Sequence, residues 1–117
     1  MSSNSVIIIV FSFFGLLACE QQKKPDHLIS ESDMIEMLAE IHIAEAMAGR
    51  LELDSYDSSQ VAYKYLENKI YEKFGVDSAI YVENYDYYAR NPRLFEQMYG
   101  EVEKKLSTEE DEQINPE

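Results

Sequence analysis

His42 and Glu45 are the two side chains of this sequence whose types and spacing are best suited to chemistry. Side chains three positions apart on a helix point to the same side, so this imidazole and carboxylate could share a proton or bind a ligand. A metal site needs three or four ligands, and the other histidine, His27, lies in a polar segment, while the single cysteine, Cys19, has another predicted role. No nucleophile and base arrangement is visible either. We therefore predict no enzyme activity, no metal and no cofactor.

The segment that holds this pair is typical of an amphipathic helix from Ser30 to about Arg50. It opens with Ser30-Glu31-Ser32-Asp33, a capping box in which the serine hydroxyl accepts from a backbone amide of the first turn. The apolar stripe and its flanks comprise Met34, Met37, Leu38, Ile41, Ala44 and Ala48. At 100° per residue, Glu45 falls in the middle of that face and His42 at its edge.

A carboxylate buried at Glu45 needs hydrogen-bond donors, because an unpaired buried charge is costly. The natural donors lie on the third predicted helix and just after it. We therefore predict a buried polar network of His42, Glu45, Tyr85, Tyr88 and Arg90. A ligand-binding site built from the same residues is the alternative.

Three further helices are predicted from caps and apolar spacing. The second begins after Asp57 or Ser58 and ends at Gly75, the third runs from Asp77 or Ser78 to about Arg90, and the fourth runs from Asn91-Pro92 to Leu106. Strand signals are weak, and short turns make consecutive helices neighbours. The expected fold is all-α, a small bundle of about four helices over residues 30–106, followed by a disordered acidic tail over 107–117.

An apolar run of thirteen residues, Val6 to Ala18, ends directly at Cys19. It is shorter than the about 20 residues that span a bilayer as a helix, so it indicates a cleaved export signal. Leu16-Leu17-Ala18-Cys19 resembles the lipobox of bacterial lipoproteins, which implies that Cys19 carries diacylglycerol and acyl chains. We expect a signal peptide over 1–18, and a lipidated cysteine and tether over 19–29.

The charged residues all follow Cys19, so the mature chain would carry the whole formal charge of -13. Phosphate backbones and anionic lipid surfaces repel such a chain, which makes nucleic acid an unsuitable partner. The predicted membrane contact is the lipid on Cys19.

Nine tyrosines and no tryptophan raise the question of a protein-binding surface. Most tyrosines fall on helical stripes and are expected in the core. The residues that lie off the stripes are Tyr56, Tyr65, Tyr71 and Tyr87, together with Ile43 and Met47. They form the candidate surface for an envelope protein partner.

Five motifs in fixed order resemble a domain-of-unknown-function family of small helical lipoproteins from Bacteroidota. They are the lipobox, Lys24-Pro25 with Leu28 to Glu31, Ile41 to Ala46, Phe74 to Ser78, and Tyr88 to Pro92. The resemblance implies a helical envelope lipoprotein and brings no established activity. Surface-exported lipoproteins of that phylum tend to carry an acidic run after the cysteine, whereas Glu20 stands alone here, so we expect an outer membrane location facing the periplasm. The leading interpretation is a non-enzymatic interaction module, and the alternative is a small-ligand-binding domain that uses His42 and Glu45.

Replacing the cysteine tests the anchor. Cys19→Ala removes the thiol that lipidation requires, so we expect the chain in soluble fractions or as an unprocessed precursor. Labelling of cells with an alkynyl fatty acid should mark the parent chain and leave the variant unmarked. A variant that is still labelled would contradict the prediction.

Overall fold

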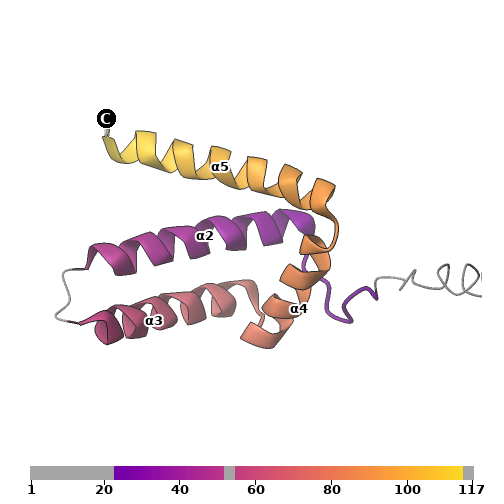
Figure 1. Ribbon diagram of the computed structural model, residues 1–117, viewed down its shortest axis with the longest axis horizontal. Coiled ribbons are helices and arrows are strands. Elements are labelled where there is room, and N and C mark those ends of the chain that lie inside the picture. The colour runs from indigo at the N-terminus through magenta and orange to yellow at the C-terminus, as the bar shows by residue number, and fades with distance from the viewer. Residues whose placement is uncertain (1–22, 52–54, 115–117) are drawn as a thin grey trace, which may run out of the picture.

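The computed structural model describes residues 23–51 and 55–114, so the predicted signal peptide and Cys19 lie outside the described residues. Four helices make up the described fold: α2 (Glu31–Arg50), α3 (Tyr56–Phe74), α4 (Ser78–Ala89) and α5 (Pro92–Ile114). The all-α prediction is therefore confirmed (Figure 1). None of the helices in this part of the chain has the length and apolar content needed to cross a membrane.

The helix ends follow local capping chemistry. The Ser30 side chain accepts from the amide of Asp33 at the start of α2, and the Asp77 side chain accepts from the amide of Ile80 at the start of α4. Gly75 ends α3 with φ 67, in the left-handed region that glycine adopts without steric cost. One predicted cap was wrong, because α3 is capped by Ser55 rather than by Asp57 or Ser58.

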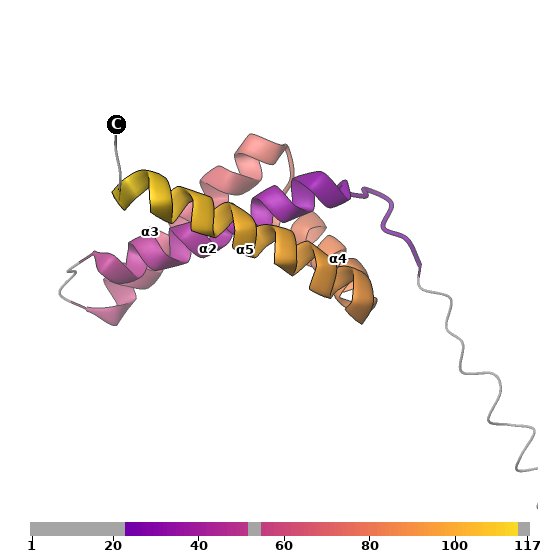
Figure 2. The ribbon, with the colours of Figure 1, turned by 90° about the horizontal axis from the view of Figure 1, so that it is seen from above.

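The central element is α2, which packs against α3 on one side and α5 on the other (Figure 1). From the end where α4 lies, α2 and α5 run in the same direction, and α3 returns antiparallel to them. Figure 2 shows α5 crossing in front of α2 when the molecule is seen from above. The short helix α4 contacts α3 and α5 at one end of this arrangement. We call this the closed end, and we call the end with the α2–α3 connection the open end.

Methionines and tyrosines fill the core. Met34, Met37 and Met98 are each 0% exposed, and the unbranched thioether side chain of methionine adapts to irregular gaps between crossing helices. A line of ring contacts then joins three helices: Tyr71, Tyr81, Tyr85, Phe95 and Tyr99, with successive centroids 5.3, 6.2, 5.4 and 4.8 Å apart. These contacts connect α3 to α5 through α4.

A non-helical segment before α2, residues 25–29, lies on α4, and we call it the strap. Asn84 of α4 is 0% exposed and holds the strap with two hydrogen bonds, accepting from the Ile29 amide and donating to the His27 carbonyl, both at 2.8 Å. The Tyr88 hydroxyl donates to the Ile29 carbonyl at 2.6 Å. Pro25 and Ile29 are buried. The predicted tether over 19–29 is therefore shorter, because its last five residues, 25–29, belong to the folded domain.

The acidic segment after Leu106 also differs from the prediction, because α5 continues through it to Ile114. Glutamate is a good helix former, and no helix breaker occurs before Asn115-Pro116. Two side chains, Ser107 and Thr108, donate to carbonyls four residues earlier, both at 2.9 Å. Low apolar content was therefore a poor indicator of disorder in this segment, because α5 continues into it from its own well-packed N-terminal half.

Removing the Asn84 amide tests whether the strap is part of the fold. Asn84→Ala leaves the buried Ile29 amide and His27 carbonyl without partners, and we expect a loss of about 1–3 kcal/mol in the free energy of unfolding. For a domain of this size the melting temperature falls by several degrees. Calorimetry of the full chain in detergent measures the melting temperature. The control is Glu83→Ala, which changes the neighbouring, exposed residue. Equal melting temperatures for the two variants would contradict the prediction.

Candidate functional site

His42 and Glu45 lie on the surface of α2. Their side chains are 41% and 71% exposed, and the His42 Nδ1 and Glu45 Oε2 atoms are 4.0 Å apart. The prediction that Glu45 lies in the core is therefore wrong. The buried positions in this part of α2 are Ala44 and Ala48, both less than 5% exposed.

The position of α4 explains this difference. α4 lies at the closed end, near the start of α2, and does not reach the second half of α2, where Glu45 is (Figure 1). The His42 ring instead makes an edge contact with Tyr99 of α5, with centroids 6.0 Å apart. The apolar period identified a helical face correctly, but only the arrangement of the other helices determines how far that face is covered.

The remaining residues of the predicted network are separated from this pair. Tyr88 donates a hydrogen bond to the strap, and Tyr85 packs edge-on against Phe95. Arg90 is exposed and is the C-cap residue of α4. The five predicted residues do not form one buried network or one enclosed ligand site. Among residues 23–51 and 55–114, no cluster of three or more His, Cys, Asp or Glu side chains is arranged to hold a metal ion.

The buried carboxylate of the described chain is Glu67 on α3, which is 8% exposed. It accepts hydrogen bonds from Lys64 Nζ at 2.6 Å and from the Tyr63 hydroxyl at 3.3 Å, and it also interacts with Tyr71. Burial by itself raises the pKa of Glu67, but these hydrogen bonds and the Lys64 charge outweigh it and hold the pKa below its usual value. Burial and the Glu67 charge together raise the pKa of Tyr63 to about 12.

Sequence spacing contained a signal for this network. Tyr63, Glu67 and Tyr71 are each four residues apart and so lie along one side of a helix. Asn84 carried a weaker signal, a single amide in a segment rich in tyrosine. Both networks are satisfied internally, which indicates structural roles.

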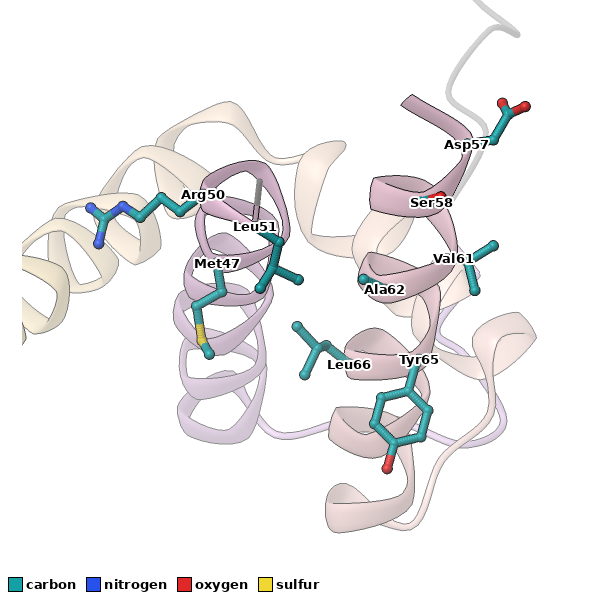
Figure 3. A pocket seen from close by; sticks show the side chains of 9 residues that line it. All are labelled: Met47, Arg50, Leu51, Asp57, Ser58, Val61, Ala62, Tyr65 and Leu66. Carbon is teal, nitrogen blue, oxygen red and sulfur yellow. The ribbon is translucent and has the colours of Figure 1, made fainter. Parts of the chain in front are cut away.

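The surface feature suited to binding is an apolar groove between α2 and α3 at the open end. It has a volume of about 890 Å³ and is lined by Met47, Arg50, Leu51, Asp57, Ser58, Val61, Ala62, Tyr65 and Leu66. Met47, Leu51, Val61 and Tyr65 are 52%, 47%, 70% and 61% exposed, although each is large and apolar. Figure 3 shows Leu51 and Leu66 pointing into the space between the two helices, while Arg50 extends the other way.

The groove includes part of the surface predicted from residues off the helical stripes. Tyr65 and Met47 line it, and Ile43 lines the adjoining part of the same α2–α3 furrow. Tyr56 is 77% exposed at the start of α3. Tyr71 was placed wrongly, since it is 5% exposed and packs on Tyr81. Tyr87 is half-buried and packs on Tyr88.

Paired alanine substitutions distinguish the buried carboxylate from the exposed one. Glu67→Ala leaves the Tyr63 and Tyr71 hydroxyls without their acceptor, so we expect a loss of about 1–3 kcal/mol in unfolding free energy. Glu45→Ala, an exposed change, should stay within about 0.5 kcal/mol of the parent. Both are measured by denaturant unfolding of the full chain in detergent.

The pH dependence of the stability lost in Glu67→Ala tests whether the ionised carboxylate is the cause of that loss. The pKa of folded Glu67 is lowered, so its contribution is present above its unfolded pKa and disappears as the pH falls through its folded pKa. The difference between the parent and Glu67→Ala should therefore shrink in acid. A difference that is independent of pH, or a larger loss for Glu45→Ala, would contradict the assignment.

Comparison with known proteins identifies a family for most of the chain. Residues 25–112 match the model of a domain of unknown function, DUF4296. No curated protein and no solved structure matches the chain. The matched range begins at the first strap residue, Pro25, and ends at residue 112 in the acidic part of α5, so it includes the whole strap and most of that acidic helical segment. The chain belongs to the DUF4296 family of domains of unknown function.

Proposed function

We propose that this chain is a lipid-anchored, non-enzymatic interaction module of a bacterial envelope membrane, and that it binds another envelope protein through the α2–α3 groove. The observation that carries the proposal is the exposure of four large apolar side chains in one groove: Met47, Leu51, Val61 and Tyr65. Contiguous exposed apolar surface of this kind marks interaction sites on soluble domains.

The shape of the groove supports a protein partner. The groove lies between two helices packed side by side, and its α3 side carries apolar residues one turn apart, Val61 and Tyr65. This is the type of surface that receives an amphipathic helix. The polar residues Arg50, Asp57 and Ser58 also line it, and a polar margin around an apolar centre is typical of protein interfaces.

The strap supports the same proposal through orientation. With the strap docked on α4, five residues, 20–24, separate the proposed lipidated cysteine from the domain, so Cys19 and Pro25 lie about 20 Å apart at most. The groove lies at the opposite end of α2, a helix of 20 residues and thus about 30 Å in length. An anchor at Cys19 would hold the closed end near the lipid and leave the groove accessible to proteins in the periplasm. The isolated Glu20 after the cysteine supports a periplasmic location at the outer membrane.

Substitution at the groove wall tests the function. In cells that carry the full chain, proteins crosslinked to it are quantified by mass spectrometry for the parent and for Val61→Ser/Tyr65→Ser. Losing two exposed apolar contacts of about 1 kcal/mol each should lower the recovery of the main partner by about tenfold or more. The control is Val82→Ser, which removes an apolar residue on α4 that is 54% exposed. Unchanged recovery in the groove variant, or equal losses in both variants, would contradict the proposal.

A further inference from the structure

A second furrow adjoins the groove on the other side of α2. It lies between α2 and α5, has a volume of about 380 Å³, and is lined in part by Ile43, Ala46 and Leu106. Met47 and Arg50 line both this furrow and the α2–α3 groove. Half-buried Ile43 and exposed Met47, four residues apart on α2, therefore form a ridge between the two furrows.

The α2–α3 groove also continues toward the closed end. A further hollow of about 290 Å³, lined by Glu40, Ile43, Ala44, Met47, Leu66, Lys69, Ile70 and Lys73, prolongs it along both helices. Its two lysines are neutralised within the chain, because Lys69 pairs with Glu72 and Lys73 pairs with Glu40. Together the two hollows follow α2 from Glu40 to Leu51. At 1.5 Å per residue this is about 18 Å, the length of about three helical turns. Ridges that fit into grooves are the general mode of helix packing, and this surface offers both.

The α5 wall of the second furrow is acidic. Glu109 and Glu110 line the furrow, and Asp111 and Glu112 follow, all of them exposed. The segment from Ser107 to Ile114 contains no lysine or arginine. A partner helix in the α2–α3 groove would have one side over the ridge at Met47 and next to this acidic wall. Basic side chains on that side of the partner would therefore be favoured.

Charge and position argue against the other occupants of the groove. A second copy of the chain would bring together two bodies with a formal charge of -13 each, and their acidic α5 segments repel. Membrane lipid would lie at the strap end, given the proposed anchor, whereas the groove is at the open end. A small apolar ligand would fill the groove without using the acidic wall.

We propose that the occupant is a basic amphipathic helix of a partner protein, about three turns long. Its apolar residues at spacings of three and four fill the α2–α3 groove, and lysine or arginine side chains on its flank reach Glu109 and Glu110 across the Ile43 and Met47 ridge. This inference rests on the proposed docking function and specifies the chemistry of the partner.

Site-specific crosslinking of the full chain in its native cells tests the occupant. A photoreactive phenylalanine analogue replaces Tyr65 in the groove or, as a matched control, Val82 on α4, which is 54% exposed. We expect crosslinked protein at Tyr65 in about tenfold excess over Val82. Sequencing of the crosslinked peptide should show net positive charge and apolar residues at i, i+3 or i+4, and i+7.

Charge reversal tests the acidic wall. Glu109→Lys/Glu110→Lys should lower the crosslinking yield at Tyr65 by about tenfold, because it replaces attraction with repulsion. Lysine near the C-terminus of α5 suits the helix dipole, so the fold is preserved. The control Glu96→Lys/Glu103→Lys makes the same charge change on exposed positions of α5 outside the furrow, and its yield should stay within about twofold of the parent.

The outcomes separate this inference from the docking function. A partner peptide that is acidic or lacks helical apolar spacing, or a yield that resists charge reversal at Glu109 and Glu110, overturns the basic helix and leaves docking intact. A crosslinked peptide from this chain itself overturns the basic helix in favour of a second copy. A lipid adduct at Tyr65, or a yield no higher than at Val82, overturns both proposals.

Discussion

The side-chain amide of Asn84 is the interaction on which the arrangement of this domain depends. It accepts from the Ile29 amide and donates to the carbonyls of His27 and Ile80, so one buried side chain joins the strap to α4. Asn84 itself is 0% exposed and its bond to the Ile29 amide is buried, so loss of the side-chain amide would leave that donor without a partner in the interior. With Tyr88, Asn84 determines where the chain enters α2 and therefore how α2 lies relative to α4.

The two ends of the molecule differ because α4 has only 12 residues and lies across one of them. At that end the strap, the buried methionines and the line of aromatic rings cover much of the apolar surface, and Leu28 and Val82 are the large apolar residues of the strap and α4 that remain exposed. At the other end α4 does not lie over α2 and α3, α5 borders only the other side of α2, and Met47 and Leu51 remain about half exposed. The apolar groove thus follows from the helix lengths. Three of the four described helices are long, and α4 is too short to cover them along their full length.

Local chemistry made most of the helix ends predictable, and long-range packing accounts for the errors. Ser30, Gly75 and Asp77 act through backbone groups within three or four residues, so sequence alone places them. Glu45 was misplaced because helical periodicity gives the direction of a side chain but not what lies opposite, which depends on the position of α4. The strap was missed for a related reason, since His27 and Asn84 are 57 residues apart and no local pattern connects them. The groove was only partly predictable, through Met47 and Tyr65, because a groove is a property of two helices.

The proposed membrane anchor and the exposed apolar groove would together favour self-association, which the acidic surface opposes. Confinement to a membrane raises the effective concentration of neighbouring copies, which favours self-association through any apolar patch. A formal charge of -13 opposes such contacts, and the acidic residues of α5 beside the groove place part of that repulsion where two copies would meet. The same charges would attract the basic partner proposed above. One set of glutamates would then disfavour self-association and favour the partner, and in that proposal the acidic extension of α5 is one wall of a binding surface.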